Sequence, residues 1–449
     1  MAAGAAAAGA ARAARAPTDR LDLLFPVTYR VNAAGHMEVG GCDLVELARR
    51  HGTPLYVYDE ATVRQRASEY MAAMGGAGQV LYSAKAFASP RFLRVVAEEG
   101  LGLDVVSAGE LFLALKAGFP RDRIHFLGNN KSREDLESAY RAGATIVIDG
   151  EHEFDLLRDV MPAAKRTPVM LRISPGVKPD THDHIATGQL DSKFGFSIES
   201  GAARRAVESA LRHPSLELVG LHSHIGSQIF ALRAYEQAME IMLSLLVELR
   251  DDLGFEPRKL GAGGGLGIAY TNQDDPPTPR HFVETVRHAL ETGCARRDLK
   301  VPELIVEPGR SIAGPAGVAL YTVGSIKDIP GVRRYVAVDG GMGDNIRPKL
   351  YGARYEAVLA SDPERAPDGK VTIAGKYCES TDILIADIEM PALKPGDVIA
   401  VPAAGAYCLA MASNYNGMPR PEVLMLRDGE AQLMRRRETL DDLVAAEVF

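Results

Sequence analysis

A lysine at the end of a short apolar run is the first residue whose type and position could do chemistry. Lys85 lies in the segment YSAKA (82–86) and closes the run QVLYSAK (79–85). A primary amine at the carboxyl end of a barrel strand can form a Schiff base with a carbonyl compound. Because most lysines are solvated surface groups, the prediction depends on which other residues meet this amine.

A glycine cluster and the segment after it indicate a phosphate site. The segment GGGLG (263–267) has bare backbone that can approach a ligand closely and present N–H groups to phosphate oxygens. The next apolar run ends in EPGR (307–310), and Ser227 could add a hydroxyl. A glycine cluster alone is more often a tight turn, but these two segments end the seventh and eighth of eight repeated units. Phosphate sites in α/β barrels favour these two loops.

Two histidines two residues apart lie in the segment HSHIGS (222–227). Alternation along a strand would put both on one face, where they could bind a metal. The nearby acids and cysteines lack a recognisable ligand spacing. We therefore expect no metal site, and we expect His224 to stack on a planar ligand and His222 to be a packing residue.

The elements that must position these residues form a repeating pattern from about residue 52 onwards. Short β-branched runs alternate with amphipathic helical segments, which is typical of parallel strands joined by crossover helices. Segments 89–100 and 131–143 each begin near a serine that could cap a helix and end in glycine. The runs are 79–85, 102–107, 124–128, 145–150, 169–174, 218–226, 259–265 and 303–310.

Eight such units predict a closed (β/α)8 TIM-like barrel. An open doubly wound sheet is the alternative, but it rarely needs eight successive units. Polar residues also follow strands from both halves of the pattern, which favours closure. The stretch 175–217 between the fifth and sixth runs is unusually long, and we expect it to contain an active-site loop.

The rest of the chain predicts a second, all-β domain of the β-sandwich or Greek-key barrel type. After residue 312 the strand-like runs follow one another without helices, and the strand-like piece 26–42 could complete their sheet. The expected organisation is listed here: a disordered Ala-rich tail (1–18), N-terminal strands joining the β domain (19–50), the barrel (51–312) and the C-terminal β domain (313–449).

Composition excludes several classes of protein. The 449 residues are 46% hydrophobic and 24% charged with a net charge of -8, and no basic tract or long apolar run stands out. Nucleic acid is therefore not an expected partner, and neither is a membrane. The four cysteines show no CxxC spacing, so we expect a reducing cytoplasm, with Cys42, Cys294 and Cys408 as packing residues. The acid-poor, Arg-bearing N-terminus leaves an organelle-targeting transit peptide as the alternative.

Taken together, the motifs resemble the diaminopimelate decarboxylase family of the alanine-racemase-like (fold-type III) pyridoxal-phosphate enzymes. The resemblance covers nearly everything after residue 45. It is carried by YSAKA (82–86), DVVSAGE (104–110), HDHIATGQLDSKFG (182–195), HSHIGSQ (222–228), GGGLGIAY (263–270), EPGRS (307–311), RPKLY (347–351), CES (378–380), GAY (405–407) and MASNYN (411–416).

The resemblance implies pyridoxal 5'-phosphate as cofactor and assigns residues to it. Lys85 would form the Schiff base, and His224 would stack on the pyridine ring. Glu307 would pair with the pyridine nitrogen, which keeps that nitrogen protonated and makes the ring a stronger electron sink. The other implied cofactor contacts are Asp104, Ser227, Gly263, Gly264, Gly265, Gly309, Arg310 and Tyr407.

The resemblance also implies the reaction, which is decarboxylation of meso-2,6-diaminopimelate to L-lysine and CO₂, the last step of lysine biosynthesis. Arg310, Arg347 and Tyr351 would bind the distal carboxylate of the substrate, and guanidinium groups suit that role because they bind carboxylates bidentately. Glu379 would bind the distal ammonium and Tyr407 would contact both substrate and cofactor. Cys378 would return a proton to the reacting carbon, in a homodimer whose CES segment completes the partner's site.

Two alternatives and two departures from the family pattern accompany this interpretation. A decarboxylase of the same fold acting on ornithine, arginine or carboxynorspermidine would not need Arg347, Tyr351 and Glu379. A catalytically inactive relative that binds a partner protein would not need Lys85 and Cys378. The sequence has YSAK where YAxK is commoner and Thr381 where glycine commonly follows CES. Neither departure removes a charged or nucleophilic group.

Overall fold

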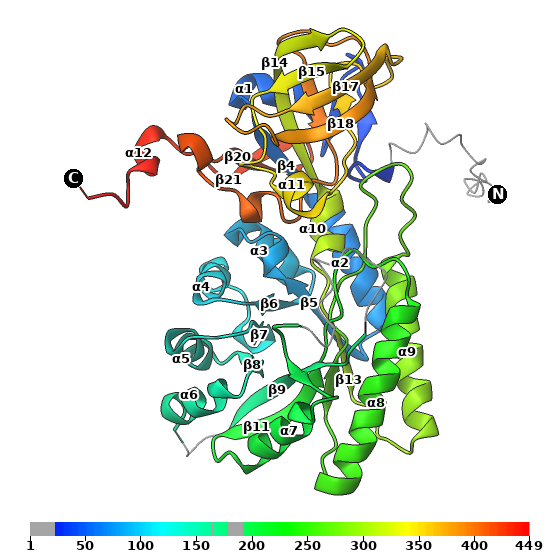
Figure 1. Ribbon diagram of the computed structural model, residues 1–449, viewed down its shortest axis with the longest axis vertical. Helices are drawn as coiled ribbons and strands as arrows, with labels where there is room; N and C mark the ends of the chain where they lie inside the picture. The colour runs from blue at the N-terminus through cyan, green and yellow to red at the C-terminus, as the bar shows by residue number, and fades with distance from the viewer. Residues whose placement is uncertain (1–22, 163–165, 178–191, 449) are drawn as a thin grey trace, which may run out of the picture.

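The protein is elongated, with a helix-covered barrel at one end and a strand-rich unit at the other (Figure 1). The computed structural model describes residues 23–162, 166–177 and 192–448. The predicted tail (1–18), with the transit-peptide alternative, lies outside the described residues, and so do residues 182–191 of the motif HDHIATGQLDSKFG.

Eight parallel strands close the barrel, and they coincide with the eight predicted runs. The ring follows chain order, and it closes where β8 pairs with β9 and where β13 pairs with β5. This confirms the closed barrel over the open sheet. The strands are β5 (Gly78–Ser83), β6 (Gly102–Val105), β7 (Ile124–Phe126), β8 (Thr145–Ile148), β9 (Thr167–Ser174), β11 (Leu216–His222), β12 (Lys259–Gly261) and β13 (Glu303–Val306), with β10 (Phe196–Ser197) beside β9.

The helices that follow these strands cover the outside of the barrel (Figure 1). Ser132 forms a capping box with Asp135 at the start of α5, and Gly143 ends that helix in the left-handed conformation, as predicted. Ser89 precedes α3, but its side chain makes no capping hydrogen bond. The helices are α3 (Pro90–Glu98), α4 (Ala108–Ala117), α5 (Arg133–Ala142), α6 (His152–Val160), α7 (Ala202–Arg212), α8 (Arg233–Leu253), α9 (Pro279–Arg296) and α10 (Arg310–Ala316), preceded by α2 (Glu60–Met74).

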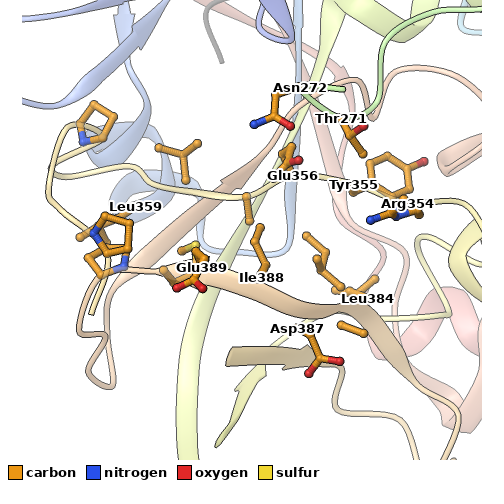
Figure 2. Close-up of a pocket in the computed structure, with 18 of the residues that line it drawn as sticks. Thr271, Asn272, Arg354, Tyr355, Glu356, Leu359, Leu384, Asp387, Ile388 and Glu389 are labelled. Atoms are coloured by element: carbon orange, nitrogen blue, oxygen red, sulfur yellow. The ribbon is translucent and has the colours of Figure 1, made fainter. Parts of the chain in front are cut away.

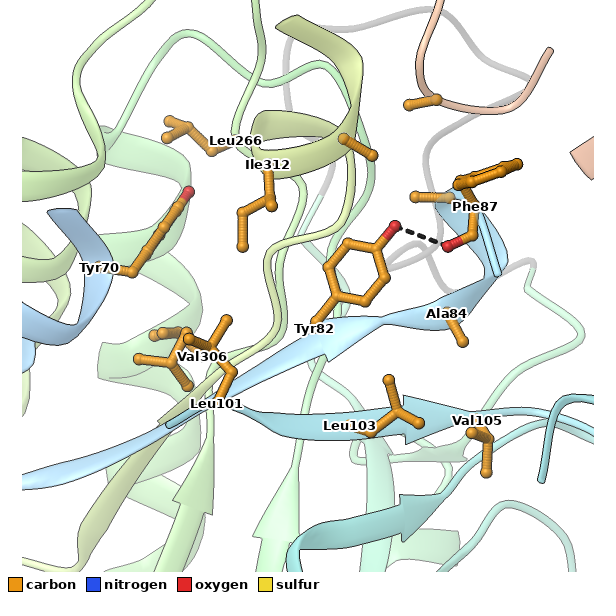
Figure 3. Close-up of a cluster of buried hydrophobic side chains, with 14 of the residues drawn as sticks. Tyr70, Tyr82, Ala84, Phe87, Leu101, Leu103, Val105, Leu266, Val306 and Ile312 are labelled. Atoms are coloured by element: carbon orange, nitrogen blue, oxygen red, sulfur yellow. Dashed lines mark hydrogen bonds between the residues drawn. The ribbon is translucent and has the colours of Figure 1, made fainter. Parts of the chain in front are cut away.

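Alternation along the strands separates the barrel interior from its outer layer. Leu81 of β5 joins Val147 and Ile305 in an apolar cluster inside the barrel. Tyr82, the next residue, belongs instead to the large cluster that includes Leu103, Phe87 and Ile312 (Figure 3). The packing of both faces fixes the end of β5, where the predicted Schiff-base lysine follows.

The second unit is built on a nine-stranded sheet, to which the chain contributes strands from before and after the barrel. β4 (Leu55–Asp59), entirely buried, pairs antiparallel with β14 and parallel with β20. The predicted domain boundaries at residues 51 and 313 stay predictions. The other strands are β14 (Gly317–Ile329), β15 (Arg333–Val338), β16 (Val358–Leu359), β17 (Gly369–Ala374), β18 (Ile383–Met390), β19 (Val398–Val401), β20 (Glu422–Arg427) and β21 (Glu430–Arg435).

The N-terminal strands differ from the expectation that residues 26–42 complete the large sheet. β1 (Arg30–Val31), β2 (Met37–Val39) and β3 (Cys42–Asp43) form a three-stranded sheet of their own. Gly40 and Gly41, both with positive φ, make the turn that folds β3 back onto β2. Met37 and Val39 nevertheless pack on the β-domain core with Leu44 of α1 (Leu44–His51).

Candidate active site

A cavity of about 420 Å³ lies at the carboxyl ends of the barrel strands, where the second unit covers them. Its volume is in the range of small-molecule sites. Side chains from both units line it, and they include many of the residues predicted from the sequence. The predicted residues that line it are Lys85, His224, Ser227, Gly265, Glu307, Gly309, Arg310, Arg347, Tyr351 and Tyr407.

Lys85 lies in a tight 3₁₀ turn (Ala84–Ala86) directly after β5. The Tyr82 hydroxyl donates to the Phe87 carbonyl at 2.9 Å, and this bond links the residues before and after the turn (Figure 3). The backbone N–H of Tyr407 donates to the Ala86 carbonyl at 2.8 Å, so the GAY loop of the second unit is tied to the lysine turn. The Lys85 amine lines the cavity and forms no hydrogen bond or ion pair with the residues that the structure describes.

Glu307 carries a negative charge in a buried position. Its Oε2 lies 2.9 Å from Nε2 of His222, and both side chains are almost fully buried. Burial raises the pKa of Glu307, but His222, Lys85 and His125 outweigh this, and the pKa lies below its ordinary value. Glu307 is therefore an anion on the cavity wall. The prediction that His222 is a packing residue is wrong, because β11 ends at His222 and aims its ring at this carboxylate.

His224 lies just beyond β11 and lines the cavity as a neutral ring. Burial, then the positive charge of Lys85, holds the pKa of His224 well below its ordinary value. The backbone N–H of Gly264 donates to His224 Nδ1 at 3.3 Å, which helps to orient the ring. A flat neutral ring held in this way suits stacking on a planar ligand.

The glycines of the GGG segment let one loop lie against two neighbouring strand ends. A Cβ at Gly264 would lie 1.9 Å from the Glu307 carbonyl oxygen, and one at Gly265 would lie 2.2 Å from the Gly226 carbonyl oxygen. Gly265 lines the cavity, whereas Gly263 and Gly264 lie behind it. Any larger residue would push the loop away from His224 and Glu307.

Asp104 also lies behind the cavity wall. It is buried at the end of β6 and accepts a hydrogen bond of 2.8 Å from the Ser83 hydroxyl. Burial, and then the nearby Glu307 carboxylate, raise the pKa of Asp104. Of these two carboxyl groups, Glu307 thus holds the charge more firmly than Asp104.

Two buried arginines give the cavity a positive wall. Arg310 and Arg347, the first residues of α10 and of α11 (Arg347–Tyr351), are only 7% and 4% exposed. Arg310 donates to Ser227 Oγ at 2.7 Å, and its guanidinium lies 4.8 Å from the centre of the Tyr407 ring. Neither arginine forms an ion pair with a described residue. A buried cation without an acid favours an anionic ligand, because the ligand supplies the missing partner.

Two tyrosines that hold these arginines were not predicted. Arg310 Nη1 donates to the Tyr270 hydroxyl at 2.5 Å, and Arg347 Nη1 donates to the Tyr355 hydroxyl. Tyr270 ends the motif GGGLGIAY, so the sequence did carry a signal for it. Tyr355 lies outside every motif that we singled out.

Cys378 and Glu379 do not line the cavity of their own chain. Both are exposed in the turn between β17 and β18. The Cys378 N–H donates to Asn416 Oδ1 at 2.9 Å, and Glu379 accepts from the Tyr415 hydroxyl at 2.5 Å. The structure thus joins the CES and MASNYN motifs on the surface of the second unit. Delivery of this surface to the cavity of a second copy stays a prediction.

Comparison with known proteins places the chain in a family. The family described as "Pyridoxal-dependent decarboxylase, pyridoxal binding domain" matches residues 60–314. Diaminopimelate decarboxylase of Bacillus subtilis is 50% identical over 423 residues, which cover 93% of this chain and 96% of that protein. That of Corynebacterium efficiens is 44% identical, with 92% of each chain covered.

Solved structures agree. The crystal structure of diaminopimelate decarboxylase from M. jannaschii in co-complex with L-lysine has a TM-score of 0.87 and 34% identity, and the match covers 94% of this chain and 98% of that chain.

The chain belongs to the diaminopimelate decarboxylase family.

Membership in the diaminopimelate decarboxylase family confirms the resemblance, the class of enzyme and the fold that the sequence predicted. The barrel whose strand ends carry Lys85 and Glu307 falls within the matched residues 60–314. Arg310 lies inside the matched range, whereas Arg347 lies beyond its end. The cavity therefore needs both units of the chain.

A larger cavity, of about 1300 Å³, adjoins the site in this family member. It lies between β18 and the segment around Glu356, and Figure 2 shows Asp387, Ile388 and Glu389 along one side. Thr271, Gln273 and Arg354 line both cavities, but Lys85 and Glu307 line only the smaller one. The smaller cavity is therefore the candidate active site of the decarboxylase.

Three general features of the described residues bear on the site. Across residues 23–162, 166–177 and 192–448 there is no group of three or more His, Cys, Asp or Glu side chains arranged to hold a metal ion. No helix in that part of the chain has both the length and the hydropathy needed to cross a membrane. Cys42, Cys294 and Cys408 are free and buried, whereas Cys378 is free and exposed.

Proposed function

We propose that this chain decarboxylates meso-2,6-diaminopimelate to L-lysine and CO₂, with pyridoxal 5'-phosphate held through Lys85. The observation that carries the proposal is a cavity that combines a lysine amine with two buried arginines that form no ion pair with a described residue. A dicarboxylate substrate would supply the missing anion at its distal end. The solved relatives from M. jannaschii and Helicobacter pylori, each in complex with L-lysine, support the same product.

The residues present fit the cofactor. The Lys85 amine lines the cavity and has no partner among the described residues that would keep it from a covalent link with the cofactor. Glu307, held as an anion by His222, would pair with the ring nitrogen, and His224 would stack on the ring. Ser227, Gly265, Gly309 and Arg310 would hold the phosphate end, with Asp104, Gly263 and Gly264 supporting them from behind. When bound, the cofactor supplies an electron-withdrawing ring that accepts the electron pair released when the C–CO₂ bond breaks.

The chain's own groups would orient the substrate and handle its protons. Arg310 and Arg347, with Tyr351 and Tyr407 beside them, would bind the distal carboxylate and so direct the opposite carboxylate toward the cofactor. Glu379 of a second copy would bind the distal ammonium. Cys378 of that copy would donate the proton of its Sγ to the carbon that has lost CO₂.

The homodimer and the cytoplasmic location belong to the same proposal. The exposed positions of Cys378 and Glu379 support an arrangement in which two copies share their sites. No nucleic acid is expected to take part, since no basic tract is present.

The direct test is an assay of substrate and product. Purified protein with pyridoxal phosphate and meso-diaminopimelate should release L-lysine and CO₂ in equal amounts, and ornithine should give little or no turnover. Efficient turnover of ornithine, arginine or carboxynorspermidine in place of diaminopimelate would overturn the substrate assignment. A visible absorption band of the bound cofactor that persists in Lys85→Ala would overturn the role of Lys85.

A further inference from the structure

The arginine pair of the cavity is held by two tyrosines: Tyr270, which itself lines the cavity, and Tyr355, which lines the adjoining larger cavity. Tyr270 contacts both arginines: its hydroxyl accepts from Arg310 Nη1 at 2.5 Å, and its ring face lies 4.5 Å from the Arg347 guanidinium carbon. Tyr355 accepts from Arg347 Nη1 and packs edge-on against the Tyr270 ring, with ring centres 5.3 Å apart and planes at 78°. Both tyrosines are buried.

We propose that Tyr270 and Tyr355 are positioning residues that fix the spacing and direction of Arg310 and Arg347, and thereby select substrates with a distal carboxylate. This inference rests on the proposed function, because it explains how the same site selects its substrate. Neither tyrosine needs to touch the reacting atoms. Each acts through the arginine that it holds.

The choice of tyrosine as partner has a physical reason. An aspartate or glutamate could hold a guanidinium in place, but it would also neutralise the charge that the substrate must meet. A phenol oxygen accepts a hydrogen bond, and a ring face attracts a cation, yet both leave the net charge of the arginine intact. Burial keeps the pKa of Tyr355 well above its ordinary value, so this phenol stays neutral. The pair thus remains positive and pre-oriented.

The Tyr355 hydroxyl is itself oriented by a third group. It lies 3.4 Å from Sγ of Cys408, a fully buried thiol that also lies 3.7 Å from the Ala406 carbonyl. Because the Cys408 thiol can donate its proton to the Ala406 carbonyl, its sulfur is free to accept from the phenol, and the phenol oxygen then keeps its lone pairs for Arg347. Cys408 was predicted to be a packing residue, and the structure adds this polar contact to its packing.

Arg347 keeps one donor for a ligand. Its Nη1 is taken by Tyr355, and its Nε is buried out of reach of a ligand, so the donor that remains is Nη2, which has no hydrogen-bond partner among the described residues. A donor of a buried side chain that lacks a partner is costly, and a ligand that satisfies it is favoured. The Tyr270 ring covers one face of the Arg347 guanidinium, so a carboxylate must approach the remaining donor along the edge of that group.

The experiment compares Tyr270→Phe and Tyr355→Phe with wild type in the cofactor-loaded full-length enzyme. Each change removes one acceptor and keeps the ring. Two readouts are measured: KM and kcat for meso-diaminopimelate, and inhibition constants for L-lysine and cadaverine. L-lysine retains the distal carboxylate of the substrate, whereas cadaverine is the same diamine without it. Tyr335→Phe is the matched control, because the Tyr335 ring also lies against an arginine, with the Arg333 guanidinium carbon 5.8 Å from the ring centre, and Tyr335 lines neither cavity.

We expect each variant to raise KM by about tenfold and to change kcat much less, which is the effect of losing one hydrogen bond to a charged group. The preference for L-lysine over cadaverine should fall by a similar factor. The absorption of the bound cofactor should stay unchanged, and Tyr335→Phe should behave like wild type. Equal weakening of L-lysine and cadaverine, or no change in KM, would overturn the inference. Failure of the proposed function would look different, since wild type itself would then neither turn over diaminopimelate nor prefer L-lysine.

Discussion

At the scale of single residues, the charge on Glu307 depends on its neighbours rather than on solvent. Burial alone would raise the pKa of this carboxyl above its ordinary value. His222 Nε2 at 2.9 Å is the strongest opposing influence, and Lys85 is the next. The residue that contacts the cofactor nitrogen in our proposal is therefore controlled by a histidine that lies behind it.

Replacing His222 by glutamine should move the pH profile of the enzyme. Without the imidazole, the pKa of Glu307 rises, because His222 is the largest of the influences that lower it. The acidic limb of kcat should shift to higher pH, and kcat at neutral pH should fall. The measurement is a kcat profile from about pH 5 to 9.

His51→Gln is the control for this variant, since His51 forms a similar pair of 2.6 Å with Glu422 outside the cavity. It should leave the profile unchanged. A profile of His222→Gln that matches that of His51→Gln would contradict the role of His222.

Cys378→Ala should retain the cofactor and lose most turnover. A positioned general acid typically contributes about 100- to 10,000-fold, and no other thiol is exposed among the described residues. The checks are the visible spectrum of the bound cofactor and kcat for meso-diaminopimelate. Turnover within about twofold of wild type would argue against proton donation by this thiol.

Residues that end strands were predictable from the sequence, and residues that support them were not. Lys85 and Glu307 directly follow apolar runs, so their place at the barrel mouth follows from the repeat. The His222 contact depends on which strand end lies opposite it, and Tyr355 reaches Arg347 through a short loop of the second unit. Such contacts depend on tertiary structure, and the residues that make them have no fixed spacing in the sequence.

At the scale of elements, the repeated strand and helix units were predicted because each shows its own hydrophobic periodicity and its own residues that start and end a helix or strand. The β domain was predictable as a class but not in its strand order. β4 joins the large sheet from before the barrel, between β14 and β20, which lie more than 250 residues further along the chain. An apolar run such as LYVYD shows that a strand is buried, but it does not name the partner strands.

Asp344 links these distant elements and should give stability a distinct pH dependence. Tyr321 of β14 and Tyr56 of β4 both donate to its Oδ2, at 2.5 and 3.0 Å. Burial raises the pKa of Asp344 from 3.8 to about 6. An acid with a raised pKa in the folded state favours folding while it is protonated, so its contribution is full below the unfolded-state pKa and is lost as the pH rises through about 6.

The expected loss between about pH 4 and 7 is on the order of 3 kcal/mol. Urea unfolding of wild type and Asp344→Asn at several pH values measures it. The unfolding free energy of wild type should fall relative to that of the variant as the pH rises. The exposed Asp428→Asn is the control and should run parallel to wild type. Parallel curves for Asp344→Asn as well would show that this carboxyl does not titrate in that window.

At the scale of the whole molecule, the cavity lies between two units, while the proposed proton donor lies on the outer surface of one of them. Arg347, Tyr351 and Tyr407 reach the cavity from the second unit of the same chain. Cys378 and Glu379 belong to that unit too, yet they are exposed and absent from the cavity wall. If both are needed for turnover, they must come from another copy.

Mixing two inactive variants tests this arrangement directly. Lys85→Ala lacks the cofactor amine and Cys378→Ala lacks the proton donor, so each homodimer should be inactive. In a heterodimer with two-fold symmetry, one site lacks both groups and the other is intact. Random pairing makes about half of the dimers mixed, so the mixture should recover about a quarter of wild-type activity per chain.

Co-expression with two different affinity tags would isolate the mixed dimer, whose activity should be about half that of wild type. An isolated mixed dimer with no more activity than its parents would mean that Lys85 and Cys378 act within one chain, and the shared-site proposal would fail.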